Sequence, residues 1–202
     1  ARVHYENTAR ALDKAEKDLA VYADLISKNQ TLYISSENLV VEMKKSAVAL
    51  LEQYALLVKA LGAGLEGSIA AGDSRTGVRY TRALVTANAI QTQMGALIQD
   101  IMYAERNNDL DAYAELQTKF SAIGAEAQSM ERLLLQPEER ALLAEAGKKY
   151  QKFIVDTAAV ADLLDKFLTA GKLRYEQYQI MYKDTIKMVE LTTRNSQKFT
   201  TG

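Results

Sequence analysis

The chain has 202 residues, of which 48% are hydrophobic and 25% are charged, and its formal net charge is −1. This composition excludes a chain that is disordered throughout, because enough apolar surface is present to form a core. The near-neutral charge, without a basic run, argues against a nucleic-acid-binding protein. A single Pro and no Cys or Trp, among many helix-forming residues, predict an all-helical protein without disulfide or thiolate chemistry.

Signals for enzymatic chemistry and for membrane insertion are missing from the sequence. No nucleophile–base pair, metal-ligand cluster or phosphate loop is visible, so we expect neither an enzyme nor a cofactor. The only histidine, His4, is expected to be a surface residue. No apolar run approaches the roughly 18 residues that span a bilayer, and no signal peptide is recognisable. Because the chain begins with Ala1 and not Met, we expect a piece of a longer protein.

The first third of the chain carries one unbroken apolar register. Positions spaced alternately by three and four residues run from Tyr5 to Leu61, and no Gly or Pro occurs before Gly62. A continuous helix over this span would be roughly 85 Å long. The register is polar in its middle, around Asn29 and Ser36, and this interruption needs an explanation.

Turn signals divide the rest of the chain into three further helices. Gly72 is suited to end the first helix in the left-handed conformation, and Asp73 or Ser74 to cap the second. The second helix is expected over about 74–106, and the segment Asn107–Asp109 predicts a tight turn after it. The apolar positions of this helix predict its buried face: Ala83, Ala87, Ile90, Met94, Leu97, Ile101 and Ala104.

A shorter and a longer register follow. The third helix repeats a heptad through Tyr113, Leu116, Phe120, Ile123, Ala127, Met130 and Leu134. The segment Gln136–Glu139 is expected to stop it and to start the last helix, with Pro137 in the first turn and two acids at the positive end of the helix dipole. A second long register then continues to Phe199, weakened at Gly171.

These lengths predict an all-α fold, an elongated antiparallel bundle of two long and two shorter helices. The middle helices are about half as long as the outer ones, so they complete a four-helix bundle over only part of them, at residues 36–170. Residues 1–35 and 171–202 form a second, stacked half-module. The polar stretch after Asn29, the Asn107–Asp109 turn and Gly171 are expected to lie level, at the boundary.

A pair of half-apolar helices cannot bury its own seam. The half-module therefore needs two more helices, either from residues upstream or from a second subunit. We expect a homodimer that forms through exposed faces of the long helices.

Polar side chains at core positions are the candidates for a ligand site, because a buried polar group needs a partner. Tyr150 is expected to face Ala87 and Ile123, and small residues such as Gly124 leave room for a guest between helices. Alternatively, these side chains bond one another or a backbone carbonyl in a dry core. The polar residues expected near one layer are Tyr54, Gln91, Thr118 and Thr157.

Two arginines one helical turn apart open the second helix. Arg79 and Arg82 together could hold an anion through bidentate hydrogen bonds. Alternatively, both are solvated and pair with acids.

Several helix-boundary patterns resemble a known family when they are taken together in order. Gly77-Val78-Arg79 opens a helix, residues 101–106 (IMYAER) end it, and residues 110–116 (LDAYAEL) begin the next. The Pro-Glu-Glu-Arg turn at 137–140 and the tetrapeptide Tyr-Gln-Lys-Phe at 150–153 follow. In this order the sequence is similar to the helical bimodular sensor domain of bacterial chemoreceptors (methyl-accepting chemotaxis proteins) and of some sensor histidine kinases.

The resemblance implies a function. It implies an extracytoplasmic, periplasmic ligand-binding domain of an inner-membrane receptor, with the 36–170 bundle distal from the membrane. Such a domain would bind a small metabolite, for example an organic acid, between helices, and would signal by a small displacement of its long helices. The receptor's output, chemotaxis or a histidine kinase, stays open. The alternative from a different class is a structural coiled-coil or interaction protein without a ligand.

Overall fold

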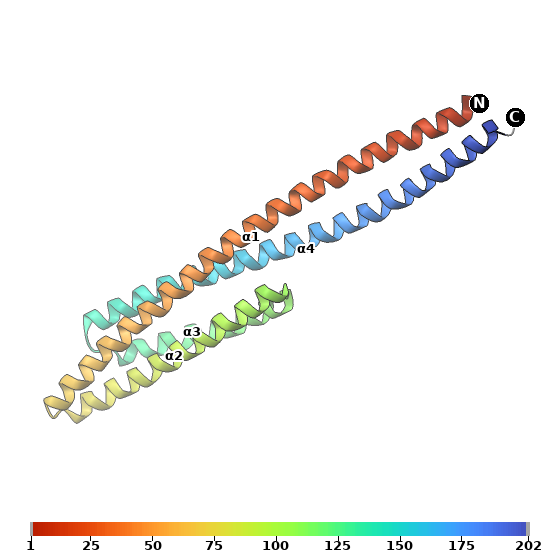
Figure 1. The fold of residues 1–202 in the computed structure, drawn as a ribbon. Helices are drawn as coiled ribbons and strands as arrows, with labels where there is room; N and C mark the ends of the chain where they lie inside the picture. The colour runs from red at the N-terminus through yellow and green to blue at the C-terminus, as the bar shows by residue number, and fades with distance from the viewer. Residues whose placement is uncertain (1, 201–202) are drawn as a thin grey trace. The chain divides into compact units, whose positions relative to one another are not determined.

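The computed structural model describes residues 2–200, with side chains described for residues 6–194, 196 and 197. Within this range the chain forms four α-helices and one short 3₁₀ helix, and no strand (Figure 1). The helices are α1 (Arg2–Ala70), α2 (Ser74–Asn107), α3 (Leu110–Met130) and α4 (Pro137–Thr200), with the 3₁₀ helix η1 (Glu131–Leu133) after α3. The predicted all-α helical bundle is confirmed. The prediction for His4 concerns a side chain outside the described set.

Both turns that flank α2 are built by the predicted residues. Gly72 adopts a left-handed conformation with φ of 70°, and the Asp73 carboxylate accepts a hydrogen bond from the Thr76 N–H at 3.1 Å. At the other end of α2, Asn108 is left-handed with φ of 53°, and Asp109 caps α3 by accepting from the Ala112 N–H. These caps satisfy backbone groups that a helix end leaves without partners, so helix ends are fixed locally.

The connection from α3 to α4 differs in detail from the prediction. The α-helical part ends at Met130, before the predicted heptad does, and a 3₁₀ turn carries the chain to a fully buried Leu134. Glu139, which is buried, accepts hydrogen bonds from the N–H groups of Leu135 and Gln136 at 2.9 and 3.0 Å. This acid therefore reaches back to cap the start of α4, where Pro137 is the first residue.

Contacts divide the chain into two units. The four-helix unit is Ser36–Leu164, and the helix-pair unit comprises Ala1–Ser35 and Asp165–Gly202. Helices α1 and α4 each contribute to both units. The predicted boundaries fell at residues 35/36 and 170/171, and the stacking of two modules stays a prediction.

The four-helix unit has a continuous apolar core. All seven residues of the predicted α2 face are buried, and α2 and α3 pack side by side (Figure 1). Tyr80 of α2 lies against Gly64 of α1, so closely that a Cβ on Gly64 would sit 2.4 Å from the ring. From α1 the core receives Val40, Met43, Ala47, Leu50, Tyr54, Leu57 and Leu61.

Helices α1 and α4 run antiparallel in the four-helix unit. The Ser46 hydroxyl donates to Asp156, and Lys149 donates to the Gln53 side chain at 3.1 Å. From the first contact to the second, the residue number increases on α1, from 46 to 53, and decreases on α4, from 156 to 149. The predicted antiparallel arrangement is therefore present in this unit.

The helix-pair unit is held by contacts between the same two helices. Tilted ring pairs join Tyr22 to Tyr178 and Tyr33 to Phe167, with ring centroids 6.3 and 6.2 Å apart. Among its described side chains only Asn29 is buried, and its Nδ2 has no hydrogen-bond partner. A Cβ built on Gly171 would lie 3.7 Å from this Nδ2, so the predicted weak point of α4 faces Asn29.

One helix is apolar enough to correct an expectation about membrane-spanning segments. Among the described residues one helix, Glu6–Ala70, contains an 18-residue window that is long and apolar enough to cross a membrane by composition. A helix that contributes to a soluble core passes the same test, and Leu50, Leu57 and Leu61 of this helix are fully buried. The expectation that no apolar run approaches this length was therefore wrong.

Candidate ligand groove between α3 and α4

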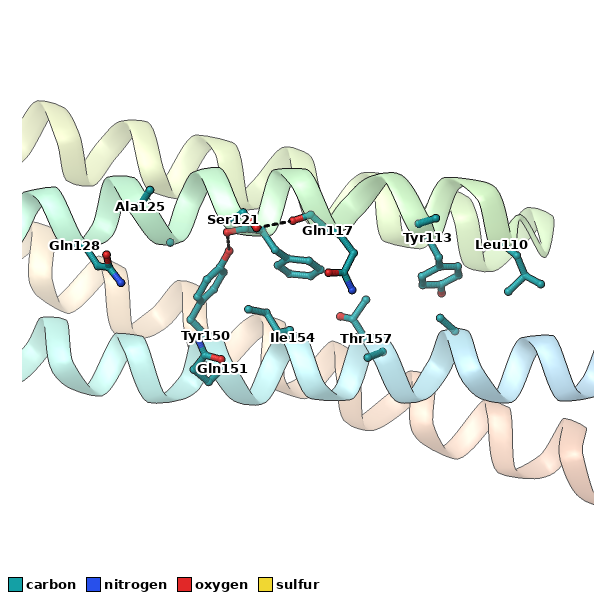
Figure 2. A pocket seen from close by; sticks show the side chains of 15 residues that line it. Leu110, Tyr113, Gln117, Ser121, Ala125, Gln128, Tyr150, Gln151, Ile154 and Thr157 are labelled. Atoms are coloured by element: carbon teal, nitrogen blue, oxygen red, sulfur yellow. Dashed lines mark hydrogen bonds between the residues drawn. The ribbon is translucent and has the colours of Figure 1, made fainter.

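A groove with a volume of about 710 Å³ lies between α3 and α4 in the four-helix unit (Figure 2). It forms because small residues on both helices, among them Gly124 and Ala161, leave the space between larger side chains unfilled. The groove is open to solvent along one side, where Gln117, Gln151 and Ala158 are exposed. The lining residues are Leu110, Tyr113, Ala114, Gln117, Phe120, Ser121, Gly124, Ala125, Gln128, Tyr150, Gln151, Ile154, Thr157, Ala158 and Ala161.

Three of the four hydroxyl groups that line the groove donate to backbone carbonyls. Tyr150 Oη donates to the Phe120 carbonyl oxygen at 2.6 Å, which ties α4 to α3 across the groove (Figure 2). Thr157 Oγ1 donates to the Phe153 carbonyl at 2.8 Å, and Ser121 Oγ to the Gln117 carbonyl at 3.0 Å. The hydrogens of these three groups are therefore already used within the protein.

The fourth hydroxyl belongs to Tyr113, which is only 6% exposed. Its ring lies between the two helices with the hydroxyl directed toward α4 (Figure 2). The oxygen is buried and has no hydrogen-bond partner in the described structure. Buried polar groups normally have a hydrogen-bond partner, and leaving one unpaired costs about 1–3 kcal/mol of stability. A bound molecule that accepted a hydrogen bond from Tyr113 would remove this cost.

The tyrosines keep their protons at neutral pH. Burial, with a smaller contribution from Glu105, raises the pKa of Tyr113 to about 12. Burial, with a smaller contribution from Glu126, raises the pKa of Tyr54 to about 12. Burial also raises the pKa of Tyr150 well above its ordinary value, with Tyr54 nearby adding to the effect. The groove therefore offers neutral phenols and not phenolates.

A second hollow, of about 280 Å³, shares Gly124, Gln128, Tyr150 and Gln151 with the groove. It differs because Tyr54 and two charged side chains, Glu131 and Arg140, line it. Arg140 Nη2 donates to the Leu134 carbonyl at 3.3 Å, so its guanidinium is partly engaged at the α3–α4 connection. Charge is thus found at the hollow, and not in the groove itself.

The structure brings together three of the six predicted ligand residues. Tyr150 and Thr157 line the groove, and Tyr54 together with Tyr150 lines the second hollow. The bonds of Tyr150 and Thr157 to backbone carbonyls are the alternative that the sequence left open. Gln91, on α2, is half-buried and lines neither space.

The arginine pair does not form an anion clamp with free guanidinium groups. Arg79 donates through Nε to the Leu133 carbonyl at 3.1 Å and through Nη2 to the Arg132 carbonyl. It therefore holds the 3₁₀ turn after α3 against α2. Arg82 is exposed and lines neither the groove nor the hollow. The expected core position of Thr118 was wrong, because this residue is exposed.

Tyr113 and Gln117 line the groove but were not among the residues predicted for the site. Tyr113 occupies a heptad position and was assigned to the core, although a phenol there among apolar neighbours could have been noticed as a polar group in need of a partner. Gln117 lies outside the heptad positions, and no sequence pattern distinguishes it from an ordinary surface residue.

Metal binding and the comparisons with known proteins add no candidate chemistry. Among the described residues, no group of three or more His, Cys, Asp or Glu side chains is arranged to hold a metal ion. Comparison of the chain with protein-family models, with curated proteins and with solved structures found no match.

Proposed function

We propose that this chain is an extracytoplasmic sensor domain of a bacterial transmembrane chemoreceptor, and that it binds a small metabolite in the groove between α3 and α4. The observation that carries the proposal is the groove itself. Its volume of about 710 Å³ falls in the range of small-molecule sites, roughly 300–1,000 Å³. The sequence resemblance to helical bimodular sensor domains supports the same function.

The composition of the groove suits a small organic molecule. Phe120, Ile154 and Leu110 supply apolar surface, and the side-chain amides of Gln117 and Gln151 supply polar groups. Small-molecule sites typically combine a mainly apolar lining with a few polar groups that fix orientation. A dry, sealed coiled-coil core would have no such space.

The proposed signal is a small shift of α4 against α3. Tyr150 ties these helices through its bond to Phe120, and Thr157 lies two turns further along α4 at the same groove. A ligand wedged between them would favour one packing arrangement over another, because packed helices switch between discrete arrangements. Since α4 is continuous from Pro137 to Thr200, a displacement in the four-helix unit reaches the helix-pair unit through one helix.

We also propose a cellular location and an oligomeric state for the parent protein. The parent protein would lie in the inner membrane with this domain in the periplasm, and two copies would form a homodimer. A sensor domain of a membrane histidine kinase would use the groove in the same way.

A structural or interaction protein without a ligand is the second candidate. The observation in its favour is the set of large apolar side chains exposed in the helix-pair unit, such as Leu19, Tyr175 and Val189. This candidate predicts oligomerisation without any effect of small molecules on stability.

A thermal-shift screen separates the two candidates. Organic acids, amines, amino acids, amides and purines would be added to the purified chain, and the unfolding midpoint recorded for each. A ligand at a hundred times its dissociation constant should stabilise the chain by about 2.7 kcal/mol. A stabilising compound whose binding perturbs the NMR signals of Gln117 and Gln151 supports the proposal. No stabilisation by any compound would contradict it.

A further inference from the structure

We propose that the groove selects an uncharged molecule that presents a hydrogen-bond acceptor to the Tyr113 hydroxyl, such as a carboxamide or a neutral carbonyl-bearing heterocycle. This inference rests on the proposed function, because it names the chemical class of the ligand for the same groove. It departs from the organic acid that the sequence resemblance implied.

The first support is the absence of charge. None of the fifteen described residues that line the groove is Asp, Glu, Lys, Arg or His. A carboxylate or an ammonium group moved into such a groove loses hydration and finds no opposite charge in exchange. A neutral polar molecule loses far less, so the lining discriminates against both signs of charge.

The second support is the unpaired Tyr113 hydroxyl. Of the four hydroxyls around the groove it alone has a hydrogen that the protein does not use, because Ser121, Tyr150 and Thr157 donate to carbonyls. The side chain is more than nine-tenths buried and is directed across the groove toward α4 (Figure 2). An acceptor atom on the ligand would provide the hydrogen-bond partner that the Tyr113 hydroxyl lacks.

The third support is a set of neutral polar groups that lie along the groove near Tyr113. Gln117 of α3 and Thr157 of α4 point toward one another across the groove (Figure 2), one helical turn from Tyr113 on the α3 side. An amide side chain both donates and accepts, and the Thr157 oxygen still accepts after donating to its own helix. Leu110 and Phe120 flank Tyr113 and Gln117 along α3 and would pack on an apolar or aromatic body.

Matched neutral and charged probes test the inference. Benzamide is compared with benzoate, and nicotinamide with nicotinate, because each pair shares shape and differs in charge. Binding to the whole chain is measured by isothermal titration calorimetry at neutral pH. We expect the amides to bind at least about tenfold more tightly than the carboxylates, which corresponds to about 1.4 kcal/mol.

Two variants and one control locate the effect. Tyr113→Phe should weaken amide binding about fivefold, as expected for the loss of one hydrogen bond, and should leave the melting temperature unchanged or higher. Gln117→Lys, at an exposed position, should turn the preference toward the carboxylates. Tyr103→Phe is the control, because Tyr103 is 65% exposed on α2 and lies outside the groove, and it should change nothing.

Three other outcomes would overturn the inferred ligand class or the proposed function. Carboxylates that bind as tightly as the amides would overturn the inference and leave the proposed function standing. A Tyr113→Phe variant that melts lower and binds amides normally would assign the hydroxyl a structural role and would also overturn it. Absence of binding by every probe and by every compound of the wider screen would contradict the proposed function, and the inference with it.

Discussion

The two units of this chain share two helices and differ in what those helices bury. Every buried apolar side chain of the described residues lies in the four-helix unit, from Val40 to Leu164. In the helix-pair unit the described side chains include one buried residue, the polar Asn29. Both halves of α1 carry an apolar register, so the register alone does not decide burial. Burial depends on how many other helices pack around the apolar face of α1.

The helix-pair unit depends on weaker contacts. Its ring pairs and its ion pair between Lys14 and Asp184 lie at exposed or half-exposed positions. Exposed ion pairs contribute little, because water and salt screen them. The four-helix unit is therefore expected to dominate the stability of the chain.

A matched pair of leucine substitutions on α1 should show the largest difference. Leu57 is fully buried in the four-helix unit, and Leu19 is 56% exposed in the helix-pair unit. Leu57→Ala should lower the free energy of unfolding by about 2–5 kcal/mol, and Leu19→Ala by no more than about 0.5 kcal/mol. Urea unfolding followed by circular dichroism measures both. An equal loss for Leu19→Ala would mean that a partner covers this face in solution.

Alkaline pH should weaken the four-helix unit through its buried tyrosines. The pKa of Tyr54 is about 12 in the folded chain and 10.0 ordinarily. The unfolded chain releases this proton first as the pH rises. Stability that depends on neutral Tyr54 is thus complete below pH 10 and lost toward pH 12, by about 2–3 kcal/mol.

The variant Tyr54→Phe isolates this effect, because it removes the titrating group. Urea midpoints of the variant and the wild type are compared from pH 8 upward. The stability of the variant relative to the wild type should rise steeply above pH 10. A difference in stability between variant and wild type that stays constant from pH 8 upward would show that Tyr54 titration does not cause the loss.

Two glycine substitutions should have opposite signs in the two units. Gly64→Ala would place a methyl group against the buried Tyr80 ring, and overpacking of this kind costs about 1–3 kcal/mol. Gly171→Ala meets Asn29 Nδ2 at an ordinary 3.7 Å and should gain up to about 1 kcal/mol from helix propensity. Hydrogen exchange of α1 and α4 amides reports each unit separately. Destabilisation by both variants would contradict the contrast between the two glycines.

The helices and their ends were predictable because their causes are local. Gly72, Asp73, Asn108 and Asp109 determine their turns through backbone conformation and capping bonds, which the sequence displays directly. The α2 face followed from the spacing of its apolar residues. In contrast, the 3₁₀ turn after Met130 depends on carbonyls held by Arg79 from another helix, and no local pattern shows that bond.

The groove was predictable only in part. Tyr150 and Thr157 were predicted as site residues because they are polar groups at core heptad positions, and both line the groove. Gln91 lies on α2, which contributes no residue to the groove, and heptad spacing does not show which pair of helices leaves space between them. Thr118 was misplaced because it lies between the α3 heptad positions Leu116 and Phe120, and it is exposed.

A groove-blocking variant tests most directly whether a small molecule occupies the α3–α4 groove. Ala158 of α4 lines the groove, and Ala141 of the same helix does not, while both are exposed. The tightest compound from the screen is titrated calorimetrically into the wild type, Ala158→Trp and Ala141→Trp. We expect binding at least about tenfold weaker for Ala158→Trp alone, with unchanged melting temperatures. Unchanged affinity in Ala158→Trp would contradict binding in the groove.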